Sequence, residues 1–243
     1  MLRFLPLPMM SLVTCVLTLL VSASPDLAAA QTANLTSPAT VSPTIHKRLI
    51  GIVLYQGFEV LDVFGPTEMW ANVPDLKVVM IAEHKGPVLS AQGVSVQADY
   101  SFEDAPKLDV VMVPGGIGTF TELKNPTFLS YLVKADKDSE FTTSVCTGSA
   151  LLAKAGLLKG RRATSNKRVF SLVAAQDPGV TWAKSARWVE DGKYVTSSGV
   201  SAGTDMALGL LARIYGAERA RKLAHTLEYQ WSEDPTNDPF AIK

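Results

Sequence analysis

The sequence TTSVCTGSALL at residues 142–152 joins a short β-prone run to a run of small, helix-prone residues, and Cys146 stands at the junction. This layout is typical of a nucleophile elbow, in which a sharp turn from strand to helix exposes one side chain above a sheet. A cysteine there lies in the positive end of the helix dipole, so we expect a lowered thiol pKa and a reactive thiolate. The alternative is a buried structural cysteine, which is the commoner fate of a free thiol.

Apolar runs alternate with helix-prone segments on both sides of this stretch. The runs at 48–55, 77–82 and 108–114 have the near-continuous apolar pattern of parallel strands that are buried on both faces. An Asp-Gly pair at 191–192, between two β-prone runs, predicts a hairpin. Because strands alternating with helices imply right-handed βαβ crossovers, we expect an α/β fold. Its form would be a flavodoxin-like, doubly wound, mostly parallel sheet with helices on both faces.

The N-terminal part of the chain predicts export. Residues 1–30 resemble a secretory signal peptide, with an apolar run at 9–23 and three alanines at 28–30 as the cleavage site. A retained membrane anchor is the alternative, but the run is short for a membrane span. Residues 31–47, rich in Thr, Ser, Ala and Pro, predict a disordered spacer, and residues 48–243 a single α/β domain. We therefore expect a secreted or periplasmic protein without stable membrane association after signal cleavage.

Charge and cysteine content narrow the function classes. The chain has 23 Lys and Arg against 23 Asp and Glu, so its neutral balance gives no electrostatic footprint for nucleic acid. Of the two cysteines, Cys15 lies in the predicted signal peptide, which leaves Cys146 as the only thiol of the mature chain. No intramolecular disulfide is then expected, and an unpaired cysteine in an exported protein is either reactive or buried. Without a thiolate cluster, zinc and iron–sulfur sites are disfavoured.

Three loops that follow the predicted parallel strands should meet at one edge of the sheet. Asp62 stands among apolar residues, where burial would raise its pKa and make it an acid or base beside the thiol; a helix cap is the alternative. The N–H groups of Gly115 and Gly116, with that of Thr147, could bind developing negative charge; a tight turn is the alternative. We therefore predict Cys146, Asp62 and Thr147 as catalytic residues, and Gly115 and Gly116 as the oxyanion and substrate-binding site.

Four groups of motifs extend over most of residues 48–240. They are YQGF at 55–58 with LDVFGP at 61–66, VPGG at 113–116, SVCTG at 144–148 with LLAKAGLLKGRRAT at 151–164, and TSSGVSAGTD at 196–205. Together they resemble the PfpI/ThiJ superfamily of class I glutamine amidotransferase-like proteins, in particular its isonitrile hydratase-like branch. The resemblance implies a flavodoxin-like domain, usually a homodimer, in which an elbow cysteine pairs with a carboxylate from the first loop. Cys146 and Asp62 match those positions, and Thr147 matches a threonine implicated in isonitrile hydratases.

The resemblance implies addition of water to an isonitrile carbon, giving an N-substituted formamide, with no metal or organic cofactor. Many relatives carry a histidine just after the RRAT segment, where this chain has Asn166. Since an amide cannot accept a proton as a base, Cys–His peptidase or amidase chemistry is disfavoured. Two alternatives stay open: a glyoxalase or deglycase acting on reactive carbonyls, and a non-enzymatic ligand-binding or oxidation-sensing module in which Cys146 forms a sulfenic acid. The expected partners are a small-molecule substrate and a second copy of the chain.

Overall fold

The computed structural model describes residues 47–242. The predicted signal peptide and nearly all of the predicted spacer lie outside the described residues. Within the described part, no helix is both long and apolar enough to cross a lipid bilayer.

A seven-stranded sheet forms the centre of the described domain, with the spatial order β10-β11-β7-β6-β1-β2-β5. Every neighbouring pair is parallel except the β10–β11 hairpin, which turns at the predicted Asp-Gly. The strands of this sheet are β1 (Arg48–Val53), β2 (Leu76–Ala82), β5 (Tyr100–Ser101), β6 (Val110–Val113), β7 (Phe141–Ser144), β10 (Trp188–Asp191) and β11 (Tyr194–Ser197). Two small sheets pair β3 (Gly86–Leu89) with β4 (Ser95–Ala98), and β8 (Arg162–Ala163) with β9 (Thr181–Trp182).

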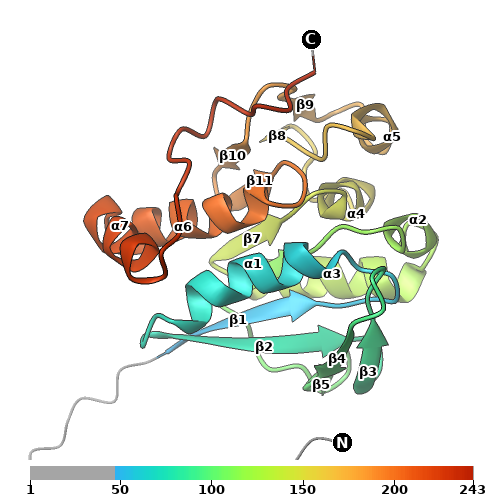
Figure 1. Ribbon diagram of the computed structural model, residues 1–243. Helices are drawn as coiled ribbons and strands as arrows, with labels where there is room; N and C mark the ends of the chain where they lie inside the picture. The colour runs from blue at the N-terminus through green and yellow to red at the C-terminus, as the bar shows by residue number, and fades with distance from the viewer. Residues whose placement is uncertain (1–46, 243) are drawn as a thin grey trace, which may run out of the picture. The chain divides into compact units, whose positions relative to one another are not determined.

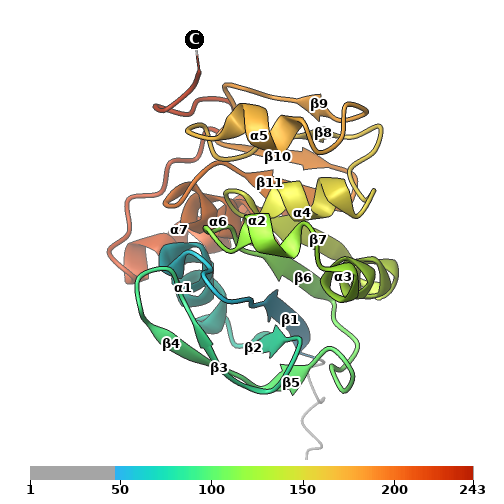
Figure 2. The same cartoon turned by 90° about the vertical axis from the view of Figure 1, so that its right-hand side faces the viewer.

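Helices cover both faces of the large sheet (Figure 2). One face carries α1 (Val60–Ala71) and α6 (Ala202–Tyr215), with α7 (Ala217–Thr226) packed against α6. The other carries α3 (Pro126–Asp138) and α4 (Gly148–Lys154). Two short helices, α2 (Thr119–Glu122) and α5 (Phe170–Ala174), complete the set within the described residues. The predicted flavodoxin-like, mostly parallel fold is thus confirmed.

Burial explains why the central strands read as continuous apolar runs. All four residues of β6 are buried, because helices pack on both faces of that strand. On the α1–α6 side, Trp70 is fully buried and its indole N–H donates to the carbonyl of Ala207 at 3.2 Å. On the other side, α3 begins with two common helix-start features. The Asn125 side chain caps the helix by accepting the N–H of Phe128, and Pro126 stands in the first turn.

The strand order brings the candidate loops together. Strand β1 lies beside β2 on one side (Figure 1) and beside β6 on the other (Figure 2), so the chain continues to one side of β1 and later returns to the other. Ligands of open parallel sheets bind at such a switch point, outside the carboxyl ends of the strands. The loops after β1, β6 and β7 all open there, as the sequence predicted.

Candidate active site

The strand-to-helix turn after β7 places Cys146 in a strained conformation. Its φ is 58°, a left-handed value that residues other than glycine seldom adopt. The backbone N–H of Cys146 donates to the carbonyl of Ser198 at 3.1 Å, which ties the turn to the end of β11. A Cβ at Gly148 would lie 2.1 Å from the carbonyl oxygen of Val113, so a glycine lets α4 start close against β6. The predicted elbow is therefore present, with its thiol only 5% exposed.

Asp62 lies fully buried in the first turn of α1 and does not cap that helix, whose N-cap position is Glu59. Its Oδ2 accepts the backbone N–H of Gly115 at 2.7 Å. Its Oδ1 has no hydrogen-bond partner among residues 47–242, although the Cys146 side chain lies near enough to lower the carboxyl pKa. Burial outweighs both effects and raises the pKa of Asp62 well above its ordinary value. The carboxyl thus tends to hold a proton beside the thiol.

The electrostatics of the thiol differ from the expectation based on the helix dipole. Burial first, and then the charge of Asp62, raise the pKa of Cys146. The N–H groups of Thr147 and Val200 and the side-chain amide of Asn166 act in the opposite direction. The predicted lowering of the thiol pKa is therefore wrong, because removal from water, the largest effect, outweighs the three hydrogen-bond donors. The raised pKa favours the protonated thiol, so a neighbour that takes its proton would promote reaction at the sulfur.

Asn166, which the sequence analysis treated as a lost base, is a donor to the sulfur. Its Nδ2 lies 3.1 Å from Cys146 Sγ. Its Oδ1 accepts the backbone N–H groups of Arg168 at 2.9 Å and Val169 at 3.2 Å, which fixes the amide with its NH₂ toward the thiol. A Cβ at Gly199 would lie 2.3 Å from Nδ2, so this approach requires a glycine. The signal in the sequence was position alone, since Asn166 stands where relatives carry a histidine.

Val200 is a site residue that sequence reasoning missed. It has a φ of 48°, an unfavourable conformation for a β-branched residue. The strained turn directs its backbone N–H at the thiol, where it lowers the pKa of Cys146. No side-chain chemistry at this position signals the role, because only the backbone carries it.

The glycine pair after β6 holds the site together in a way that the sequence did not predict. The N–H of Gly115 is engaged by Asp62, and that of Gly116 donates to Thr147 Oγ1 at 3.0 Å. Both amides would have to exchange these partners before they could bind a substrate anion, so the donors that face the sulfur belong to Thr147 and Val200 instead. A Cβ at Gly115 would lie 2.5 Å from the backbone nitrogen of Thr147. Glycine at this position therefore allows the two loops to approach.

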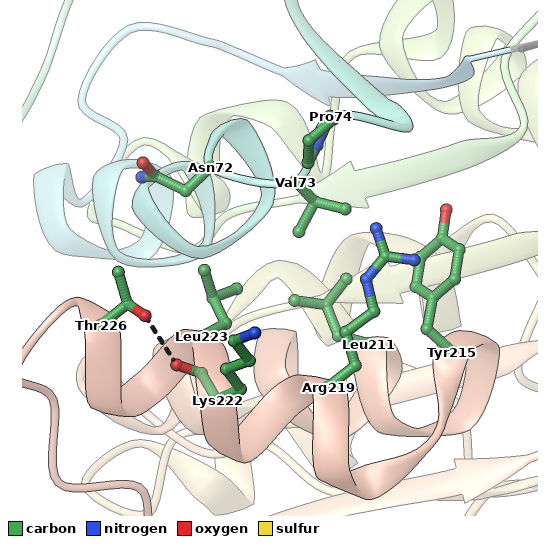
Figure 3. A pocket seen from close by; sticks show the side chains of 9 residues that line it. All are labelled: Asn72, Val73, Pro74, Leu211, Tyr215, Arg219, Lys222, Leu223 and Thr226. Carbon is green, nitrogen blue, oxygen red and sulfur yellow. Dashed lines mark hydrogen bonds between the residues drawn. The ribbon is translucent and has the colours of Figure 1, made fainter.

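Two cavities differ in their relation to the thiol. One of about 350 Å³ has Asn166, Val200 and Phe240 among its lining residues. Asn166 and the backbone N–H of Val200 also donate toward the sulfur of Cys146, so this cavity adjoins the surroundings of the thiol. A larger one of about 540 Å³ lies between the end of α1 and the helices α6 and α7, where Arg219 and Tyr215 line it (Figure 3). None of the five predicted site residues lines either cavity, but only the smaller one shares Asn166 and Val200 with the surroundings of the thiol. The smaller cavity is the candidate space for a substrate.

The comparisons with known proteins identify the family of the chain. The family model described as the DJ-1/PfpI family matches residues 48–213. Isonitrile hydratase of Pseudomonas putida is 36% identical over 180 residues, which cover 74% of this chain and 78% of that protein. Deglycase TK1284 of Thermococcus kodakarensis is 28% identical over 148 residues, 60% of this chain and 87% of that protein. A crystal structure of a ThiJ/PfpI family protein from Pseudomonas syringae superposes with a TM-score of 0.71 at 28% identity, covering 82% of this chain and 84% of that one. The chain therefore belongs to the DJ-1/PfpI family.

Proposed function

We propose that this protein is an isonitrile hydratase, a lyase that adds water to the carbon of an isonitrile and releases an N-substituted formamide. The observation that carries the proposal is the buried pair of Cys146 and Asp62, a nucleophile and a proton-holding carboxyl set side by side. The donor to the sulfur is an amide, Asn166, where a Cys–His enzyme would place a base. The similarity to the isonitrile hydratase of Pseudomonas putida supports the same reaction.

Two routes fit these residues. In the first, the sulfur of Cys146 bonds to the isonitrile carbon, which gains a proton and becomes a thioimidate. Water then bonds to that carbon, the carbon–sulfur bond breaks, and the formamide leaves as the thiol regains its proton. In the second, water bonds directly to the carbon while Asp62 takes and returns a proton. Both routes need a carboxyl that exchanges a proton near neutral pH, and the burial of Asp62 moves its pKa in that direction.

The cavity beside the thiol supports a substrate with an apolar organic group. Its walls include Val200 and the ring of Phe240, which is 68% exposed at the surface of the domain. An aliphatic or aromatic substituent placed there would cover this apolar surface while the isonitrile carbon points toward the sulfur.

A second candidate is a deglycase or glyoxalase acting on reactive carbonyls such as methylglyoxal. The similarity to Deglycase TK1284 favours it, and the reaction would use the same thiol. Asn166 weighs against it, because the amide cannot act as the base that the family histidine would supply.

We also propose that the protein is exported and forms a homodimer. Helix α1 turns Asp62 inward and exposes Leu61 and Phe64, at 41% and 42%, which supports a self-association surface beside the site. Light scattering of wild type and of a Leu61→Lys, Phe64→Lys variant tests the dimer, because only the variant should be monomeric. Mass spectrometry of the chain recovered from the expressing cells tests cleavage after residue 30.

The function is tested by following formamide formation from cyclohexyl isocyanide in wild type, Cys146→Ala and Asp62→Asn. We expect turnover by the wild type and a fall in the rate of about 10³-fold or more in each variant. When two residues act as a unit, removing either one abolishes most of the activity. Activity that survives both substitutions would contradict the assigned roles. Methylglyoxal serves as the parallel substrate, and turnover of methylglyoxal alone would favour the second candidate.

A further inference from the structure

A chain of buried hydroxyl groups runs from the interior to the active site. Tyr55 Oη lies 2.9 Å from Thr119 Oγ1, which lies 2.8 Å from Thr147 Oγ1. Tyr55 Oη also lies 2.8 Å from the backbone carbonyl oxygen of Pro114. Tyr55 is 4% exposed and Thr119 is fully buried, so bulk water does not compete for these hydrogen bonds.

The carbonyl at the inner end sets the direction of every hydrogen in this chain. A carbonyl oxygen only accepts, so the 2.8 Å contact with Pro114 requires the single hydroxyl hydrogen of Tyr55. The contact between Tyr55 and Thr119 then requires the hydrogen of Thr119. The remaining contact, between Thr119 and Thr147, requires the hydrogen of Thr147. Burial raises the pKa of Tyr55 well above its ordinary value, so the phenol keeps its proton.

The opposite arrangement, with donation running outward from Tyr55 to Thr147, leaves one close oxygen pair without a hydrogen between its atoms. Thr147 Oγ1 also lies 3.4 Å from the carbonyl oxygen of Gly116, a longer contact to which it could donate. In that case Thr119 would have to donate to Thr147, and Tyr55 to Thr119. The 2.8 Å contact between Tyr55 and Pro114 would then join two oxygens with no hydrogen between them. The short contacts therefore favour donation from Thr147 inward.

This direction defines what Thr147 can offer a substrate. Its hydrogen goes to Thr119, and one of its lone pairs accepts the N–H of Gly116 at 3.0 Å. A hydroxyl oxygen has two lone pairs, so one is left, on the residue that follows Cys146. Any further contact of the Thr147 hydroxyl is therefore one in which it accepts a hydrogen bond and does not donate one.

We propose that Tyr55 and Thr119 are positioning residues that hold Thr147 as the acceptor for the water molecule consumed in hydration. This inference rests on the proposed function. The water donates one O–H to Thr147. This hydrogen bond orients a lone pair of the water oxygen toward the substrate carbon. As the carbon–oxygen bond forms, Asp62 takes a proton from the water and gives one to the substrate: to the isonitrile carbon in the direct route, where the resulting imidic acid moves its hydroxyl proton to nitrogen to become the formamide, and to the nitrogen in the thioimidate route, whose carbon already carries a hydrogen. The same placement serves the direct route and the thioimidate route.

Substitution of the two positioning residues tests the proposal by activity. In Thr119→Val and Tyr55→Phe, Thr147 is free to turn its hydrogen toward the site. We expect kcat for cyclohexyl isocyanide to fall about tenfold, the rate equivalent of one hydrogen bond, with KM changed less than about twofold. Thr119→Ser keeps the hydroxyl and should restore kcat. The control is Thr143→Val, which removes a buried hydroxyl that donates only to the carbonyl of Val111.

An unchanged kcat in both Thr119→Val and Tyr55→Phe overturns the proposal, and so does a fall in Thr119→Ser as large as that in Thr119→Val. A tenfold fall in Thr143→Val would also overturn it, because loss of any buried hydroxyl would then give the effect.

Neutron diffraction from deuterated crystals tests the direction without any substrate. We expect deuterium between Tyr55 and Pro114, on Thr119 toward Tyr55, and on Thr147 toward Thr119. Deuterium on Thr147 pointing toward Cys146 or toward the carbonyl of Gly116 overturns the inference. A wild type that hydrates no isonitrile refutes the proposed function, while the neutron result still decides the hydroxyl direction.

Discussion

Two clusters of buried and half-buried residues lie near the carboxyl ends of the strands, and they are built differently. The thiol cluster consists of Asp62, Cys146, Thr147, Asn166 and Val200. The ion cluster consists of Lys167, Arg187, Asp205 and Asp238. Asn166 and Lys167 are neighbours in the chain, so the two clusters adjoin. Each cluster contains fully or nearly fully buried side chains, so burial does not distinguish the two.

The ion cluster is a closed set of paired charges. Arg187 Nε donates to Asp205 Oδ2 at 2.6 Å, and the Tyr229 hydroxyl donates to Asp205 Oδ1 at 3.0 Å. Asp238 Oδ2 has no hydrogen bond within the described chain, but Lys167 Nζ lies 3.7 Å away and compensates its charge. These contacts fasten the segment after α7 to the domain. The cluster is structural.

The thiol cluster is left open in two ways. Asp62 Oδ1 has neither a hydrogen bond nor an opposite charge among the described residues. Cys146 and Val200 both adopt left-handed conformations that cost free energy. Strain and unpaired polar atoms persist at sites where chemistry requires them. The comparison teaches that incomplete pairing, and not burial, separates the thiol cluster from the ion cluster.

The largest expected effect on stability comes from breaking the ion cluster with Arg187→Met. Buried Asp205 would lose its charged partner and Asp238 one of its two, and an uncompensated buried charge typically costs about 3–5 kcal/mol. The measurement is the free energy of unfolding from urea denaturation. The control is Arg213→Met, which breaks the partly exposed pair with Glu190 and should cost less than about 1 kcal/mol. Equal losses in the two variants would show that the ion cluster does not stabilise the fold.

A smaller effect is expected from removing the amide donor of the thiol cluster. In Asn166→Ala the pKa of Cys146 should rise further, and each pKa unit lowers the rate of iodoacetamide alkylation at pH 8 about tenfold. Gly199→Ala should lower the rate similarly, because its new Cβ displaces the Asn166 amide. The control is Gly179→Ala, whose Cβ would meet the side chains of Asp177 and Lys159, none nearer than 3.1 Å, and not the Asn166 amide. An unchanged alkylation rate in both test variants would remove Asn166 from the cluster.

The smallest effect concerns how stability depends on pH. The folded-state pKa of Asp62 is raised above its ordinary value of 3.8, so its stabilising contribution is complete below that value and is lost as pH rises through the folded pKa. Asp62→Asn lacks this loss, so its Tm should exceed that of the wild type at pH 8 by about 3 °C, the shift that roughly 1 kcal/mol produces in a domain of this size. At pH 4 the difference should be smaller.

The control for this pH dependence is Asp104, an exposed carboxyl whose pKa the neighbouring Lys85 lowers to about 2. Its sign is opposite, because its contribution is present above the ordinary pKa and is lost as pH falls toward 2. Asp104→Asn should therefore not gain stability at pH 8. Parallel curves of Tm against pH for wild type and Asp62→Asn would contradict the raised pKa of Asp62.

The sequence by itself determined the fold class and the meeting of Cys146, Asp62 and the glycine loop. These follow from short-range patterns: apolar runs that mark buried parallel strands, a strand-to-helix turn at the cysteine, and the rule that ligands bind where such strands end. Each pattern depends on residues that are close in the chain, so it can be read without knowing which distant segments touch.

Only the tertiary structure decided which hydrogen bonds join these residues and how their pKa values shift. Three features depend on partners from distant segments: the hydrogen bond from Gly115 to Asp62, the orientation of the Asn166 amide toward the sulfur, and the strained amide of Val200. The raised pKa of Cys146 depends on burial, which no local pattern measures. Hydrogen-bond direction and desolvation are properties of the packed domain, so they appear only when the fold has brought the groups together.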